Sequence, residues 1–343
     1  MTQLHFVVPG LLGPFSEALP SYIQQQLKQS EFTLINKLLS KAKISEFNSN
    51  SYFETLAQII SPQCKLSVTQ LTALADGIDT SECYFYRADP VHFKAESDHA
   101  ILVGTDLLSP AHQEASELVN AFNQHFLDDN ISLHFTAESR WYLKSCRPLE
   151  LSFTALDYAL GRDIKHFMPK DVGENNDALW WRKILNEAQM LFFQHEINQN
   201  REERGALAIN GLWLWDLLAS STEKISQVQQ LYSTEVMAVA LANQSAIKVQ
   251  AVNEINNINS SSVLVHSSLY ESVCYGDVDA WVEELSRFCA NELQTVCSLL
   301  NEKKIDEIIF YPSDGRVFTA NRIDLLKFWK KHLTVGSYVA VDT

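Results

Sequence analysis

The spacing of hydrophobic residues switches between strand-like and helix-like periods along the chain, which predicts an α/β protein. Short apolar runs of the strand type lie at His5–Val8, Ala100–Gly104 and Ile131–Thr136, and Arg140–Leu143 is expected to pair with the last of them as a hairpin. Residues 110–127 instead place apolar side chains three and four apart, which predicts an amphipathic helix. We therefore expect a mixed sheet flanked by helices, with a smaller α+β unit.

The longest helical pattern runs from about Asn176 to Arg204, and Gly205 follows it where a helix commonly ends. Its apolar face, continued at the same spacing, includes His195. Glu187 precedes this histidine by two turns, so both side chains are expected roughly in line. An inward histidine beside a carboxylate can line a cleft. The alternative is a core histidine whose hydrogen bonds are made within the protein.

The last third of the chain predicts further strands and helices after an Asn- and Ser-rich loop at residues 253–262. In order they are strand Val263–His266, helix Val278–Leu300, strand Ile308–Tyr311, strand Val317–Ala320 and helix Arg322–Lys331. We expect three segments: an N-terminal strand and helical segment at 1–75, a central α+β ligand-site region at 76–225, and a C-terminal α/β segment at 226–343 that completes the core.

The amino-acid composition argues against several classes of function for this protein. The 343 residues are 46% hydrophobic, as in a globular protein with a sizeable core. The net charge of −15 argues against nucleic acid and anionic membranes as partners, because both attract a basic surface. No apolar run is long enough to span a bilayer, and the start of the chain lacks a secretory signal pattern. Six cysteines without C-x-x-C spacing indicate reduced thiols, so we expect a cytoplasmic protein without structural zinc.

The first candidate site is the run from Arg87 to His92, which follows a strand-like segment. Proline at position 90 drives Asp89 out of helical geometry, and α/β proteins commonly place ligand groups at strand ends. Asp89 and His92 could orient a phosphorylated or carboxylated ligand, and Arg87, Lys94 and Arg140 could neutralise it. The alternative is a solvated hairpin with local ion pairs.

The second candidate is the segment Asn210–Asp216, a short strand that opens onto a loop. Under strand alternation Trp213 and Trp215 share one face, where they could stack on a ligand beside Asn210. Core packing is the alternative. The expected ligand-site residues are Arg87, Asp89, His92, Lys94, Arg140, Glu187, His195, Asn210 and Trp213.

Common catalytic motifs do not occur in the sequence. It has no G-x-S-x-G or H-E-x-x-H motif, no phosphate-binding P-loop and no glycine-rich dinucleotide fingerprint. No motif in the sequence therefore marks a catalytic nucleophile, and this favours a binding protein over an enzyme.

Three runs carry a family resemblance: Ala88–His92, Leu185–Leu191 and Asn210–Trp215. They resemble a bacterial family labelled cofactor-independent phosphoglycerate mutase or RpfE-type regulatory protein, over most of the chain and best at residues 84–216. The resemblance implies an alkaline-phosphatase-like α/β fold with a two-metal site and an inserted substrate domain.

This chain departs from the family pattern at the metal site. The family carries an aspartate after the first strand, where this chain has Pro9-Gly10. Glu271 and Tyr275 stand where the resemblance implies Asp and His. We expect no metal, no cofactor and no catalytic residue, and a regulatory or non-catalytic protein that binds a small phosphorylated or carboxylated anion. The alternatives are an active metal-dependent mutase or phosphoryl transferase, and a protein-interaction module whose Trp-rich face could form a homodimer.

Overall fold

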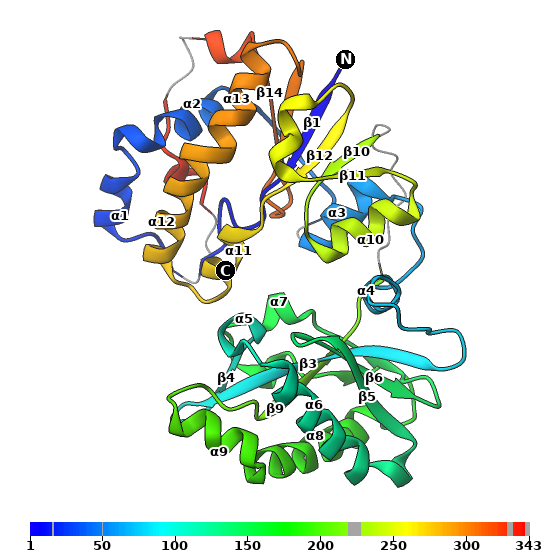
Figure 1. Cartoon of the computed structure of the whole chain (residues 1–343). Helices are drawn as coiled ribbons and strands as arrows, with labels where there is room; N and C mark the ends of the chain where they lie inside the picture. Colours follow the sequence, from blue (N-terminus) through cyan, green and yellow to red (C-terminus); the bar gives the residue numbers. More distant parts are fainter. Residues whose placement is uncertain (16, 50, 219–227, 328–331, 340–343) are drawn as a thin grey trace. The chain divides into compact units, whose positions relative to one another are not determined.

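The computed structural model describes residues 1–15, 17–49, 51–218, 228–327 and 332–339. The chain forms two compact units (Figure 1). Unit 1 comprises Met1–Lys65 and Ala219–Thr343, and unit 2 comprises Leu66–Leu218. Each unit has its own sheet.

Unit 1 is built on a seven-stranded sheet with the order β11-β10-β12-β1-β13-β14-β2. The strands are β1 (Gln3–Val7), β2 (Lys43–Glu46), β10 (Gln230–Tyr232), β11 (Lys248–Gln250), β12 (Ser262–Val265), β13 (Glu307–Tyr311) and β14 (Arg316–Asn321). Neighbours from β11 to β13 pair in parallel, whereas β14 is antiparallel to both β13 and β2. The predicted mixed sheet flanked by helices is confirmed.

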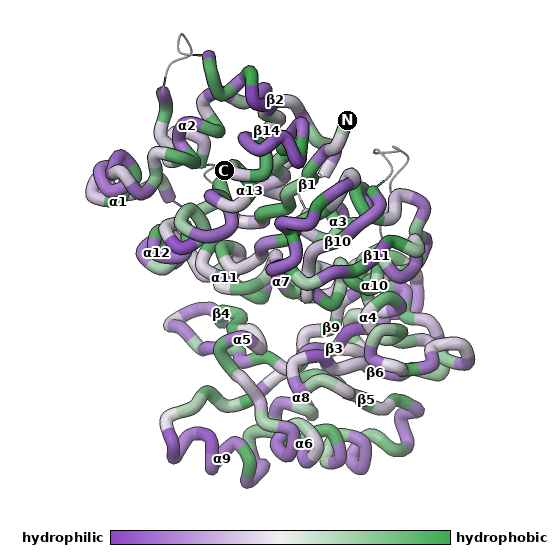
Figure 2. Tube along the Cα trace, turned by 45° about the horizontal axis from the view of Figure 1, so that its top comes forward, coloured by the Kyte–Doolittle hydropathy of each residue, from purple (hydrophilic) through white to green (hydrophobic). Residues whose placement is uncertain are grey.

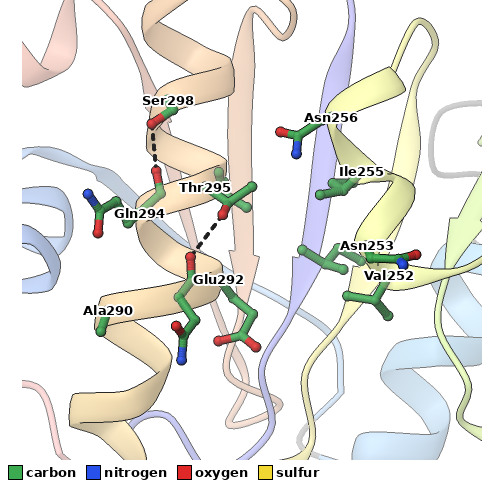
Figure 3. A pocket seen from close by; sticks show the side chains of 12 residues that line it. Val252, Asn253, Ile255, Asn256, Ala290, Glu292, Gln294, Thr295 and Ser298 are labelled. Carbon is green, nitrogen blue, oxygen red and sulfur yellow. Dashed lines mark hydrogen bonds between the residues drawn. The ribbon is translucent and has the colours of Figure 1, made fainter.

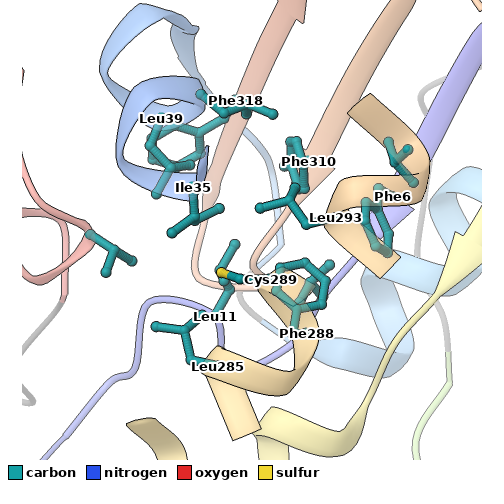
Figure 4. Close-up of a cluster of buried hydrophobic side chains, with 14 of the residues drawn as sticks. Phe6, Leu11, Ile35, Leu39, Leu285, Phe288, Cys289, Leu293, Phe310 and Phe318 are labelled. Atoms are coloured by element: carbon teal, nitrogen blue, oxygen red, sulfur yellow. The ribbon is translucent and has the colours of Figure 1, made fainter. Parts of the chain in front are cut away.

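The main core of unit 1 lies on one face of this sheet. Side chains alternate along β1, so Leu4 and Phe6 enter this core while His5 points to the other face. Helices α2 (Thr33–Lys41), α12 (Val278–Phe288) and α13 (Gln294–Asn301) supply the facing apolar residues. Figure 4 shows those of α2 and α12. Helices α3 (Tyr52–Ile60) and α10 (Val236–Gln244) pack on each other on the opposite face (Figure 1).

The predicted helix Val278–Leu300 is present, with one change in its winding. Between α12 and α13 the segment Cys289–Leu293 forms a π-helical turn, η5. Such turns are rare, and they occur frequently at functional sites. Here the turn carries Glu292.

The remaining elements of unit 1 are short. They are α1 (Ser21–Gln26), η1 (Ser30–Phe32), η4 (Val252–Asn257), α11 (Ser268–Cys274), η6 (Asp324–Leu326) and η7 (Val335–Ser337). The expected loop at 253–262 thus begins as a 3-10 helix. Of the predicted helix Arg322–Lys331 only η6 is formed, and residues 328–331 lie outside the described residues.

Unit 2 contains a five-stranded sheet, β4-β3-β6-β5, in which β9 also pairs with β3. Its strands are β3 (Tyr84–Ala95), β4 (Ala100–Val103), β5 (Ile131–Ala137), β6 (Arg140–Ser145), β9 (Gly211–Trp215) and the separate pair β7 (Leu151–Ser152) and β8 (Lys170–Asp171). Its helices are α4 (Val68–Ala75), α5 (Thr105–Leu108), α6 (His112–His125), η2 (Leu127–Asp129), α7 (Leu156–Ala159), η3 (Ile164–His166), α8 (Asp177–Gln194) and α9 (Glu196–Glu203). The predicted β5–β6 hairpin and α6 are confirmed.

The sequence suggested that Asp89-Pro90 lies at the end of a strand, and this prediction is wrong. The motif lies in the middle of β3, which β9 accompanies from Arg87 to Val91. On its other side β3 pairs with β6 up to Arg87 and with β4 from His92 onward. Pro90 falls in the gap between these two partners, where the missing N–H costs no ladder bond on that side.

The expected single helix Asn176–Arg204 is wrong at His195, which has extended backbone angles (φ −74°, ψ 137°) and separates α8 from α9. Asn198 fixes the break. Its amide nitrogen donates to the carbonyls of Phe192 and Ile209, each at 2.8 Å, and its amide oxygen accepts from Ile209 N at 2.7 Å. The second helix is largely hydrophilic (Figure 2).

None of the helices in the described part of the chain combines the length and the apolar composition needed to cross a membrane.

Candidate functional site

Arg87 and Asp89 form a buried ion pair in unit 2. Arg87 Nη2 donates to both Asp89 carboxylate oxygens, at 2.7 and 2.8 Å, and Nε donates to Oδ1 at 3.0 Å. Asp89 is 0% exposed and Arg87 only 6%. A ligand anion would therefore have to displace a carboxylate that is already bound in the bidentate geometry preferred by arginine.

Neighbouring aromatic residues complete this pair. Trp215 Nε1 donates to Asp89 Oδ2 at 2.7 Å, and the Trp141 backbone N–H donates to Oδ1 at 3.3 Å. The Arg87 guanidinium carbon lies 5.2 Å from the Trp215 ring centroid and 5.6 Å from that of Tyr142. The charges thus tie β3 to β6 and β9 within the core of unit 2.

The other two expected cations also have acidic partners. Lys94 Nζ lies 2.9 Å from Glu96 Oε1 at an exposed position, and Arg140 Nη2 lies 2.6 Å from Asp76 Oδ1. Burial alone would raise the pKa of Asp76, but hydrogen bonds from Arg140 and Tyr142 outweigh it and hold that pKa below its ordinary value. Asp76 is therefore charged at neutral pH and neutralises Arg140.

His92 and Asn210 meet at the edge of β3. His92 Nδ1 donates to the Ala208 carbonyl at 2.8 Å. Asn210 Oδ1 accepts from Phe93 N at 2.7 Å, and its amide nitrogen donates to Phe93 O at 3.1 Å. The hydrogen bonds of both side chains thus attach the segment before β9 to strand β3.

The last three expected residues lie apart from one another. Glu187 pairs with His125 at the exposed surface, at 3.3 Å. His195 Nδ1 accepts from Ile197 N and caps α9. Trp213 is buried, and its Nε1 donates to the Thr154 carbonyl at 3.0 Å. Each side chain therefore has a local partner in the fold of unit 2.

In unit 1 the carboxyl end of β12 brings an imidazole to the core face. His266 follows Leu264 by two positions and so points to the same face of the sheet. Its Nδ1 lies 3.9 Å from Glu292 Oε1, and its Nε2 lies 4.0 Å from Glu284 Oε1. Burial lowers the pKa of His266 and outweighs the two glutamates, which act to raise it. The imidazole is therefore neutral at pH 7.

A pocket of about 790 Å³ has Glu292, the neighbour of His266, among its lining residues. One wall is η4, and the other is formed by η5 and α13 (Figure 3). Val252, Ile255, Leu264 and Val296 provide its apolar surface. Its polar surface comes from Asn253, Asn256, Asn291, Glu292, Gln294, Thr295 and Ser298.

Two hydroxyl groups in the pocket have a defined orientation. Thr295 Oγ1 donates to the Asn291 carbonyl and Ser298 Oγ donates to the Gln294 carbonyl, both at 2.9 Å (Figure 3). The Asn291 amide nitrogen donates to the Arg287 carbonyl at 3.0 Å. These protons point into the protein, so the oxygens face the pocket mainly as acceptors.

The family resemblance implied two metal ions, and the residues that the structure describes do not fit them. Among the described residues, no group of three or more His, Cys, Asp or Glu side chains is arranged to hold a metal ion. The His266 nitrogens lie 3.9 and 4.0 Å from the glutamate oxygens and have an aromatic ring, Phe288, packed at 4.8 Å. Two divalent cations would need a denser set of carboxylates and imidazoles.

The residues that line the pocket of unit 1 were not predicted from the sequence. A signal for them was present on the helix side, where polar residues recur at positions 291, 294, 295 and 298, three or four apart. Asn253 and Asn256 on the opposite wall fell in a segment that read only as a polar loop. Nothing in the sequence pairs the two walls, because they are distant in the chain.

No protein-family model matches this sequence, and a search of the curated proteins found no significant match. Among solved structures, the chain is similar to the cofactor-independent phosphoglycerate mutase from Thermoplasma acidophilum DSM 1728. The identity is 13%, the match covers 99% of this chain and 95% of that chain, and the TM-score is 0.43. It is also similar to the PH0037 protein from Pyrococcus horikoshii, with 12% identity, 93% and 87% coverage and a TM-score of 0.47. The RpfE-type assignment stays a prediction.

Proposed function

We propose that this chain is a small-molecule-binding protein whose ligand site is the pocket of unit 1 between η4 and η5–α13. The observation that carries the proposal is the pocket itself: about 790 Å³, within the range of roughly 300–1,000 Å³ typical of ligand sites. Its lining combines apolar side chains with several polar ones, as ligand sites commonly do.

The hydroxyl groups of the pocket favour binding over catalysis. A serine or threonine nucleophile needs a general base within hydrogen-bond reach. Thr295 and Ser298 give their protons to backbone carbonyls of their own helix, so neither is paired with such a base. An active mutase or phosphoryl transferase remains the alternative, and assaying 3-phosphoglycerate turnover with Mn²⁺ tests it. We expect none.

The ion pairs of unit 2 count against the site expected from the sequence. Arg87 and Arg140 each hold a carboxylate, and opening either pair would leave a charge without its partner. A phosphorylated or carboxylated ligand in unit 2 stays a prediction. Trp213 and Trp215 are 1% and 6% exposed, so a partner would find little of the Trp-rich face at the surface.

Thermal shift measurements with a defined compound panel test the proposal. The panel contains neutral sugars and polyols, amines, nucleosides, carboxylates and phosphorylated metabolites, including 3-phosphoglycerate. A compound that binds only the folded state raises its stability by about 2.7 kcal/mol at a concentration of 100 Kd. The variant Asn256→Trp should abolish any such shift, because it adds a large side chain to the wall of the pocket.

The matched control is Asn257→Trp, an exposed neighbour in the same 3-10 helix that does not line the pocket. It should retain every shift seen in the wild type. The proposal is contradicted when no panel compound stabilises the protein, or when Asn256→Trp and the control respond alike.

A further inference from the structure

We infer that the pocket of unit 1 takes a hydroxylated amine, a small molecule rich in hydrogen-bond donors that carries one positive charge. This inference rests on the proposed function, because it names the ligand class for the same site. It differs from the anionic ligand expected from the sequence.

The helical wall of the pocket is rich in acceptors. Thr295 and Ser298 present hydroxyl oxygens whose protons are already engaged, and Glu292 presents a carboxylate. A carboxylate and an engaged hydroxyl can only accept hydrogen bonds. A ligand that fills this wall must therefore supply N–H or O–H groups, whereas a phosphate or carboxylate would bring further acceptors.

The charge of the pocket points the same way. Glu292 is the single charged side chain among its lining residues. The nearest cationic side chain along the helix, Arg287, is engaged by Glu283 and Glu284. His266, 3.9 Å from Glu292, has a pKa lowered by burial and is neutral at pH 7. A protonated amine would supply the missing counter-charge, and an anion would be repelled.

The opposite wall suits the body of such a molecule. Asn253 and Asn256 carry amides that both donate and accept, and they make no hydrogen bond within the part of the chain that the structure describes. These amides can therefore donate a hydrogen bond to a ligand hydroxyl group or accept one from it. Ile255 and Leu264 offer an apolar surface for the carbon skeleton (Figure 3).

Isothermal titration at about pH 6.5 with glucosamine, glucose and glucuronate tests the inference, because one ring then carries a positive, a zero or a negative charge. We expect glucosamine to bind at least about tenfold more tightly than glucose, and glucuronate to bind most weakly. Glu292→Gln should remove the preference for glucosamine over glucose, because it removes the negative charge of the pocket. The control Glu283→Gln, an exposed residue of α12 outside the pocket, should keep the preference.

Three results would overturn the inference: equal binding of glucosamine and glucose, tighter binding of glucuronate, or no binding of any of the three. The proposed function would survive each of them if another panel compound binds and Asn256→Trp abolishes that binding. It would fail separately if no compound depends on the pocket.

Discussion

Arg87 and Asp89, two residues apart in strand β3, form a bidentate ion pair that Trp215 completes from strand β9. Residues two apart in a strand point to the same face, so the pairing follows from the period of the strand itself. Because both side chains are buried, the pair is a structural element of unit 2.

Breaking this pair should destabilise the protein strongly. Asp89→Asn leaves the buried guanidinium without its counter-charge, and we expect a loss of about 3–5 kcal/mol in the free energy of unfolding, measured by urea denaturation. Lys94→Met removes the exposed pair with Glu96 and should leave the free energy of unfolding nearly unchanged. Similar losses in the two variants would contradict the structural role of Arg87 and Asp89.

His5 should make stability depend on pH. Burial lowers the pKa of His5 to about 4 in the folded protein, against an ordinary value of 6.5. Between these two pH values the unfolded chain binds a proton at His5 and the folded protein does not. The contribution of neutral His5 to the free energy of unfolding is therefore complete above about pH 6.5 and is lost as the pH falls toward 4. The loss is roughly 3 kcal/mol.

The measurement is the free energy of unfolding of the wild type and of His5→Gln across this pH range. Glutamine has no charge to gain, so the difference between the two proteins should shift against the wild type as the pH falls. A difference that does not change with pH would contradict the low pKa of His5.

Asn198 should be needed for the junction of α8 and α9. Asn198→Ala leaves the N–H and carbonyl of Ile209 and the carbonyl of Phe192 without this partner, and we expect a loss of about 1–3 kcal/mol. The exposed neighbour Gln199 serves as control, and Gln199→Ala should change stability by no more than about 0.5 kcal/mol. Equal effects in chemical denaturation would argue against the role assigned to Asn198.

Alanine substitutions at Gly10 and Gly77 distinguish the effect of backbone strain from that of steric crowding. Both have positive φ, 76° and 74°, so alanine at either position costs about 1–2 kcal/mol in backbone strain. A Cβ at Gly10 would also lie 2.9 Å from the Leu269 carbonyl oxygen, whereas at Gly77 it would meet open space. Gly10→Ala should therefore lower Tm more than Gly77→Ala, and the reverse order would refute the close packing of this loop on α11.

The sequence predicted those parts of the fold that depend on local periodicity. The β5–β6 hairpin and helix α6 have clear periods of two and 3.6, and both formed as expected. The break at His195 escaped prediction because Asn198 makes its bonds to Ile209, eleven residues away, and the apolar spacing runs through the break.

The candidate site was harder to predict for a different physical reason. A polar run such as Arg87–Asp89 looks like a ligand site when its partners are unknown, yet here the two residues neutralise each other and Trp215 supplies the remaining bond. The pocket of unit 1 combines η4 with α13, about forty residues later in the chain, and only the folded sheet brings them together.

The position of the ligand site is tested most directly by amide hydrogen exchange with the panel compound that gives the largest thermal shift. We predict slower exchange in η4 (Val252–Asn257) and in residues 289–298, where the pocket walls lie. Protection confined to residues 84–95 and 208–215 of unit 2, or no protection in either unit, would contradict the proposal.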